Sequence, residues 1–155
     1  MDNHDQEPDA TRLAAWRAFL TAHARAVAAI ERDLAAGDFI PLTWYDVLVP
    51  LSEAPGGRLR LHELADRVVL SRSGLTRLVD RLERSGLLRR EPCLTDRRGA
   101  YAVLTEEGKA TLRQTWPTYA RGIEQHFARH LSAAEADLIA SALERVATGG
   151  DGDAG

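Results

Sequence analysis

Hydrophobic residues near the start of the chain recur at alternating intervals of three and four positions. The residues in this series are Leu13, Trp16, Leu20, His23, Val27, Ile30 and Leu34, and only the histidine is polar. A heptad spacing of this kind predicts one long helix with an apolar stripe, which Gly37 and Asp38 end. The stripe needs a surface to pack on, either the chain's own core or a second copy of the chain.

A second apolar helix is predicted to begin around Pro41. Thr43 is the expected N-cap, with Asp46 in the capping-box position three residues later. Pro50 lies inside this helix and should bend it, because proline lacks the amide hydrogen and its ring clashes with the preceding turn. Residues 58–60 then alternate polar and apolar side chains, which favours a short strand.

Two short amphipathic helices follow, joined by a tight turn. The first is marked by the apolar residues Leu61, Leu64, Ala65 and Val68. The second starts after Ser71, an N-cap residue type, and ends at Ser85-Gly86. Its apolar side carries Leu75, Leu78, Val79 and Leu82. This arrangement predicts a helix-turn-helix.

Two strand-like runs, residues 87–91 and 101–104, flank a polar loop that contains Asp96-Arg97-Arg98-Gly99. This pattern predicts a β-hairpin directly after the helix-turn-helix, which is the position of a wing.

Two further helices are predicted after the hairpin. Thr105 caps the first, which is expected to run to about His130 with a bend at Pro117. A capping box at residues 132–135 opens the last helix, which residues 138–146 line with apolar side chains. The predicted fold class is therefore mainly α with a small β-wing.

The composition fits one globular domain spanning residues 1–155. The chain is 45% hydrophobic and 28% charged, and its one cysteine excludes an intrachain disulfide. We find neither a secretion signal nor an uncharged run long enough to span a membrane. We therefore expect a soluble cytoplasmic protein with no membrane partner.

The net charge of −3 argues against a nucleic-acid partner unless the charges are unevenly distributed. Residues 71–98 hold eight arginines against four acids, a local balance of +4, and the rest of the chain carries −7. Because salt screens charges beyond about 10 Å, a polyanion responds to the local field rather than to the total. A solvated charged face is the alternative explanation.

The polar side of the helix after Ser71 suggests a use for this charge. A recognition helix presents such a side to the major groove, where Arg bonds guanine and Ser or Thr bonds a base edge or a phosphate. The expected DNA contacts are Ser71, Arg72, Ser73, Thr76 and Arg77 at the N-terminal end, and Arg81 and Arg84 on phosphates further along. The alternative for each arginine is an ion pair with Asp80 or Glu83.

The hairpin loop supplies a second set of expected contacts. Arg97 and Arg98 at its tip suit the minor groove, whose negative potential is enhanced where it is narrow. Asp96 is placed to hold one of them by a local ion pair.

The winged core resembles that of the MarR (multiple antibiotic resistance regulator) family over residues 61–108, which read LHELADRVVLSRSGLTRLVDRLERSGLLRREPCLTDRRGAYAVLTEEG. The specific points are SRSGLTRLVDRLERSGLLRR, the turn at residues 96–99, and Leu104-Thr105 followed by Gly108. By motif the resemblance covers about a third of the chain, and by the layout of helices it covers nearly all of it.

The resemblance implies a homodimeric transcriptional repressor on a near-palindromic operator in double-stranded DNA. Residues 43–108 would form the DNA-binding region, and residues 8–36 and 109–147 the dimerisation helices. The expected dimer contacts are Leu13, Leu20, Val27, Leu138 and Leu143. Residues 1–7 and 149–155 are expected to be disordered acidic tails.

The resemblance also implies release from DNA by a small, often aromatic effector that binds between the dimerisation helices and the winged core. The candidate lining residues are Trp16, His23, Trp44, Tyr45, Leu48, Trp116 and Tyr119. Aromatic residues at helical spacing also occur as ordinary core, which is the alternative.

Other chemistry finds little support in the sequence. Arg89, Arg90 and Arg97 lie near Cys93 and are expected to lower its pKa, although a small strand residue is the simpler interpretation. His126 and His130 share a helix face without completing a zinc ligand set, so no metal or other cofactor is expected. No nucleophile or phosphate-loop motif suggests an enzyme.

A winged-helix protein-interaction module without sequence-specific DNA binding remains the alternative function. The sequence does not identify the effector, the operator, the regulated genes, the direction of regulation or a redox role for Cys93.

Overall fold

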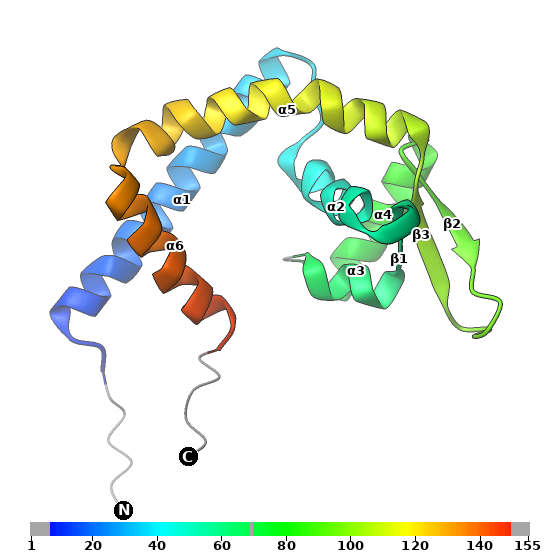
Figure 1. Ribbon diagram of the computed structural model, residues 1–155, viewed down its shortest axis with the longest axis horizontal. Helices are drawn as coiled ribbons and strands as arrows, with labels where there is room; N and C mark the ends of the chain where they lie inside the picture. The colour runs from blue at the N-terminus through cyan, green and yellow to red at the C-terminus, as the bar shows by residue number, and fades with distance from the viewer. Residues whose placement is uncertain (1–6, 69, 150–155) are drawn as a thin grey trace, which may run out of the picture. The chain divides into compact units, whose positions relative to one another are not determined.

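The computed structural model describes residues 7–68 and 70–149 (Figure 1). Its elements, in chain order, are α1 (Ala10–Ala36), α2 (Leu42–Glu53), a 3-10 turn (Pro55–Gly57), β1 (Arg58–Arg60), α3 (Leu61–Arg67), α4 (Arg72–Arg84), β2 (Leu88–Pro92), β3 (Ala100–Leu104), α5 (Glu106–His126), a second 3-10 turn (Ala128–His130) and α6 (Ala133–Ala147). The predicted fold class is confirmed. The tails predicted at both ends fall, except for Glu7 and Gly149, outside the described residues.

The chain divides into two compact units. The described residues up to Ile30 and from Ala120 onward form one unit, which we call the terminal-helix unit. The described residues of Glu31–Tyr119 form the other, the winged unit. Helices α1 and α5 each contribute residues to both units. We describe each unit by itself.

The winged unit contains a three-stranded antiparallel sheet in the order β1-β3-β2. Strands β2 and β3 form the predicted hairpin, with Leu88 opposite Leu104 and Pro92 opposite Ala100. The short strand predicted at residues 58–60 is also confirmed, and it pairs with β3 on the side away from β2. The loop between β2 and β3 extends beyond α3 and α4 (Figure 1).

The core of the winged unit forms where the apolar sides of its helices meet the sheet. Its main cluster includes completely buried leucines from α2, α3, α4 and β2, namely Leu48, Leu51, Leu64, Leu82 and Leu88. Burying each such side chain stabilises the fold by about 1.5–3 kcal/mol. The 3.6-residue periodicity read from the sequence therefore determines which side of α4 is left for solvent.

Helix α2 corrects one prediction. Thr43 is not the N-cap, because the helix already begins at Leu42, and Pro41 occupies the cap position without a side-chain hydrogen bond. Glu31 of α1 supplies the missing acceptor, since its Oε1 accepts a hydrogen bond of 2.9 Å from the backbone N–H of Leu42. A cap that comes from another helix leaves no local sequence signal.

Helix α5 corrects a second prediction, the position of its C-terminal end. The helix was predicted to reach about His130, but it ends at His126, where Phe127 adopts φ −140° and ψ −66° before a separate 3-10 turn. No glycine or proline marks this break. The predicted start is confirmed, because the Thr105 hydroxyl accepts a hydrogen bond of 3.0 Å from the Gly108 N–H.

In the terminal-helix unit, α1 and α5 approach closely at Gly122. A Cβ atom at that residue would lie 2.9 Å from Cγ1 of Ile30, so glycine permits the contact. The capping box predicted for α6 is confirmed, with Ser132 and Glu135 bonded reciprocally. No residue of α6 is buried. None of the helices within residues 7–68 and 70–149 has the length and hydrophobicity needed to cross a lipid bilayer.

Candidate nucleic-acid interface

Helix α4 is fixed at both ends and along one side. The Ser71 hydroxyl accepts a hydrogen bond of 3.1 Å from the Gly74 N–H, as predicted for an N-cap. The four predicted apolar residues, Leu75, Leu78, Val79 and Leu82, are all buried. The opposite side of the helix therefore faces solvent as a rigid surface.

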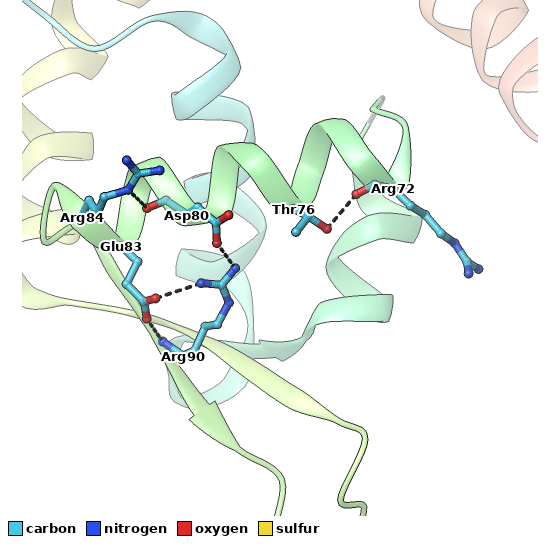
Figure 2. Close-up of polar contacts among 6 residues, drawn as sticks. All are labelled: Arg72, Thr76, Asp80, Glu83, Arg84 and Arg90. Carbon is cyan, nitrogen blue, oxygen red and sulfur yellow. Dashed lines mark hydrogen bonds and ion pairs between the residues drawn. The ribbon is translucent and has the colours of Figure 1, made fainter.

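The predicted contact residues on α4 occupy this exposed side. Those exposed are Ser71, Arg72, Ser73, Thr76, Arg77, Arg81 and Arg84. The Thr76 hydroxyl donates a hydrogen bond of 2.9 Å to the Arg72 carbonyl, and the Arg72 side chain extends away from the helix (Figure 2). A row of cations and hydroxyl groups thus follows the helix from its N-terminus.

Two acids on the same helix are bound by Arg90 of β2 (Figure 2). Its Nη1 donates to Oε1 of Glu83 at 2.9 Å and its Nη2 to Oδ1 of Asp80 at 2.5 Å. The Arg90 backbone N–H also donates to Oε2 of Glu83 at 2.6 Å. Partial burial works to lower the pKa of Arg90, but the hydrogen bonds that it donates to the carboxylates of Asp80 and Glu83, together with their negative charge, outweigh burial and the net pKa is raised.

This network bears on the alternative explanation, in which the arginines of α4 form ion pairs with Asp80 or Glu83. Asp80 and Glu83 are ion-paired with Arg90, and across residues 7–68 and 70–149 no ion pair is formed by Arg72, Arg77 or Arg81. Among the described residues, Arg84 bonds to its own helix, from Nε to the Asp80 carbonyl oxygen at 3.3 Å. The acids of α4 are thus bound by Arg90, and the arginines on the exposed side of the helix are not ion-paired with them. This role of Arg90 was not predicted from the sequence, although the two acids on the preceding helix were a signal for a basic partner.

The hairpin tip is held by hydrogen bonds from backbone N–H groups to the side chain and the carbonyl oxygen of Asp96. Asp96 accepts a hydrogen bond of 2.9 Å from the Arg98 backbone N–H, and the Gly99 N–H donates to the Asp96 carbonyl at 3.1 Å. The predicted ion pair between Asp96 and a wing arginine is therefore wrong, because its carboxylate closes the turn instead. Arg97 and Arg98 are exposed, as is Leu94 at 99%, which the sequence analysis did not single out.

Cys93 is a buried residue of the same hairpin. Its Sγ lies 3.3 Å from the Thr95 hydroxyl, and that hydrogen bond is the main cause that lowers its pKa, with Arg60 contributing less. The predicted direction is confirmed, but the predicted cause is wrong. Arg89 pairs with Glu91 at 2.8 Å and Arg90 with the α4 acids, so neither is directed at the thiol.

The winged unit also contains a hollow of about 400 Å³ beside α2. Its lining residues are Thr43, Tyr45, Asp46, Val47, Val49, Pro50, Arg67, Val68, Leu70 and Tyr119. The rings of Tyr45 and Tyr119 meet edge to face at 5.0 Å, and burial raises the pKa of both phenols.

The structure brings only part of the predicted effector set to this hollow. Tyr45 and Tyr119 line it, and Trp116 packs on Tyr119 with ring centroids 6.0 Å apart. Leu48 is completely buried in the core, Trp44 packs against that core, and neither lines the hollow. Trp16 and His23 belong to the terminal-helix unit.

The predicted dimer residues differ in exposure. Leu20, Leu138 and Leu143 are exposed, while Leu13 and Val27 are half-buried. In the described part of the chain, no group of three or more His, Cys, Asp or Glu side chains is arranged to hold a metal ion.

A helix-turn-helix preceded by one strand and followed by a projecting hairpin, all three strands forming one sheet, defines the winged helix-turn-helix class. The sequence model of the MarR family matches residues 40–99. Sco3205 of Streptomyces coelicolor, a MarR family transcriptional regulator solved in complex with DNA, is 32% identical with a TM-score of 0.87, and the match covers 98% of this chain and 95% of that one. The chain belongs to the MarR family of transcriptional regulators.

Two curated relatives match over shorter regions. The HTH-type transcriptional regulator MhqR of Bacillus subtilis (strain 168) is 34% identical over 86 residues, 56% of this chain and 59% of MhqR. The homoprotocatechuate degradative operon repressor of Escherichia coli is 40% identical over 60 residues, 39% of each chain. These matches span less than two thirds of the relatives' length. By name, the first relative is a transcriptional regulator and the second an operon repressor.

Proposed function

We propose that the protein is a sequence-specific DNA-binding regulator that represses transcription as a homodimer on a near-palindromic operator. The observation that carries the proposal is the exposed side of α4, where Arg72, Arg77 and Arg81 form no ion pair with the described residues. Uncompensated guanidinium groups on a helix packed on its other side suit the major groove of a duplex.

Each contact residue has a role that follows from its place. Near the N-terminus of α4, Arg72, Ser73, Thr76 and Arg77 read base edges with Ser71 beside them, whereas Arg81 and Arg84 hold phosphates. At the hairpin tip, Arg97 and Arg98 enter the minor groove while Asp96 holds their loop in shape. The DNA complex of Sco3205 supports a duplex as the partner, and the repressor among the relatives supports repression.

A second copy of the chain is the proposed partner of the terminal-helix unit. Helix α6 buries none of its residues within the protomer and leaves Leu138 69% and Val146 75% exposed. Leu20 and Trp16 of α1 are exposed as well. Apolar side chains on this scale are typical of a subunit interface, and two-fold symmetry would set the operator half-sites about one helical turn apart.

The hollow beside α2 is the proposed site for a small aromatic effector. Its wall combines apolar side chains with polar groups, namely the phenols of Tyr45 and Tyr119, the guanidinium group of Arg67, the carboxyl group of Asp46 and the hydroxyl group of Thr43. A volume of about 400 Å³ is within the range of small-molecule sites. A role on chromosomal DNA makes the cytoplasm the proposed compartment.

Selection of bound duplexes from a random pool tests the proposed function. We expect one preferred, near-palindromic site. Arg77→Ala should weaken binding to that site by about 1–3 kcal/mol and relax the base preference, because a base contact is lost. Arg98→Ala should weaken operator and random duplex more nearly alike.

Gel shifts at fixed salt compare these variants with the unchanged chain. Weak, uniform binding to all duplexes, with no preferred site after selection, would favour a protein-interaction module. Unchanged binding in both variants would refute the assignment of α4 and the hairpin to the grooves.

A further inference from the structure

Arg90 differs from the other arginines of the interface in what its side chain does. It is 29% exposed, and both of its terminal nitrogens are bonded to acids of α4 (Figure 2). The guanidinium group therefore has little capacity left for a direct contact with DNA. Its partners, rather than the duplex, explain why an arginine stands at this place on β2.

We propose that Arg90 is a positioning residue for DNA recognition, which draws the carboxylates of Asp80 and Glu83 onto β2 and cancels half of their charge. This inference rests on the proposed function. Asp80 and Glu83 are negatively charged side chains on α4, the helix proposed to approach the phosphates of DNA.

The two acids lie close to the arginines that are proposed to contact DNA. Asp80 directly precedes Arg81 and lies three residues after Arg77, within the arginine-bearing side of α4. The side chains of Asp80 and Glu83 are 42% and 37% exposed, so burial does not remove their charge from the surface. Left alone, both carboxylates would repel nearby phosphates and compete for the arginines that are to bind them.

Strand β2 is suited to hold these acids. It is an edge strand, since β3 lies between it and β1, and the Arg90 N–H bonds to Glu83 rather than to a neighbouring strand. Glu83 thus receives hydrogen bonds from the backbone and the side chain of one residue. Asp80 receives the second arm of the same guanidinium group, which a lysine could not supply in this geometry.

The test compares Arg90→Gln with Arg89→Gln on the preferred duplex. Arg89 is the matched control because it lies next along β2, loses the same charge, and pairs with Glu91 of the strand instead of with α4. We expect Arg90→Gln to bind about tenfold more weakly than Arg89→Gln at low salt, with the gap narrowing as salt screens the freed carboxylates.

A rescue separates charge masking from a general loss of structure. Asp80→Asn and Glu83→Gln, added to Arg90→Gln, should return the affinity to within about threefold of the unchanged chain, because no anion is left to mask. The pair Asp80→Asn/Glu83→Gln with Arg90 intact should bind at least as tightly as the unchanged chain. This pair decides the question if Arg90→Gln alone does not fold, as judged by circular dichroism.

Three results would overturn the inference: equal binding by Arg90→Gln and Arg89→Gln, a gap that does not change with salt, or weaker binding when the acids are neutralised with Arg90 present. If the unchanged chain binds no duplex, the proposed function fails and this inference fails with it. Duplex binding by the unchanged chain, combined with any of the three results, removes the inference alone.

Discussion

At the scale of single residues, Gly108 shows how little room the winged unit leaves at the start of α5. A Cβ atom there would lie 2.1 Å from the Leu87 carbonyl oxygen and 2.6 Å from Cδ1 of Leu104. The Thr105 hydroxyl fixes this turn as well, since it donates 2.6 Å to the Gly86 carbonyl and accepts from the Gly108 N–H. The turn therefore joins the end of α4 to the start of α5 by backbone contact.

Replacing Gly108 by alanine should destabilise the protein by about 1–3 kcal/mol, because the added methyl group can be accommodated only by moving the Leu87 backbone. Urea unfolding followed by circular dichroism measures the change. Gly99→Ala is the control, since a Cβ atom there meets its nearest neighbours at an ordinary 3.4 Å. Equal stability of the two variants would contradict the close approach at Gly108.

Helix caps were predictable where a residue type acts on its own neighbours and not where the partner comes from elsewhere in the fold. The local ion pair expected at Asp96 was wrong, because its carboxylate bonds to the backbone instead. The caps at Ser71, Thr105 and Ser132 were visible as local patterns and are confirmed. The bond from Glu31 to Leu42 spans eleven residues, and no local pattern announces it. The bonds of Arg90 are also long-range and were not predictable, because its partners depend on how β2 packs against α4.

At the scale of elements, α6 depends on its first turn more than a packed helix would. Glu135 accepts hydrogen bonds from the backbone N–H and the hydroxyl of Ser132, at 2.8 and 2.9 Å. These bonds lower the pKa of Glu135 below its ordinary value of 4.5. A lowered pKa in the folded state means that the bonded carboxylate stabilises the fold above that ordinary value and ceases to do so as the pH falls through the folded-state pKa.

Glu135→Gln should therefore lower the stability at pH 7, and the difference from the unchanged chain should shrink as the pH is lowered below about 4.5. Urea unfolding at several pH values measures this. Glu144→Gln, on the same helix outside the first turn, controls for the loss of a negative charge. A difference that stays constant down to pH 3 would show that the carboxylate does not cap the helix.

The elements were largely predictable because their hydrophobic periods differ. The 3.6-residue spacing of α4 and the two strand-like runs of the hairpin each specify one element without reference to the rest. The end of α5 was not predictable, since Phe127 leaves the helical conformation in a stretch free of glycine and proline. No residue type that ends helices stands there, so the local sequence carries no signal for the break.

At the scale of the whole molecule, the exposed apolar residues of the terminal-helix unit lead to a prediction about assembly. Leu20→Asp combined with Leu138→Asp should convert the proposed dimer into monomer or unfolded chain, because the charges would be buried without partners. Light scattering measures the mass.

The control for assembly is Leu94→Asp in the hairpin loop. Leu94 is 99% exposed and lies in the winged unit, so the same substitution there should leave the mass unchanged. A dimer that persists in the Leu20→Asp/Leu138→Asp chain would show that the two copies meet through a different surface.

Helix α6 has a consequence for how abundant the protein must be. A helix of fifteen residues with no buried side chain is only marginally stable in water when alone. If a second copy covers it, as we propose, part of its stability comes from association, which follows mass action. On dilution the C-terminal helix would begin to unwind while the winged unit keeps its own core. A low concentration of the protein would therefore weaken its binding to the proposed operator.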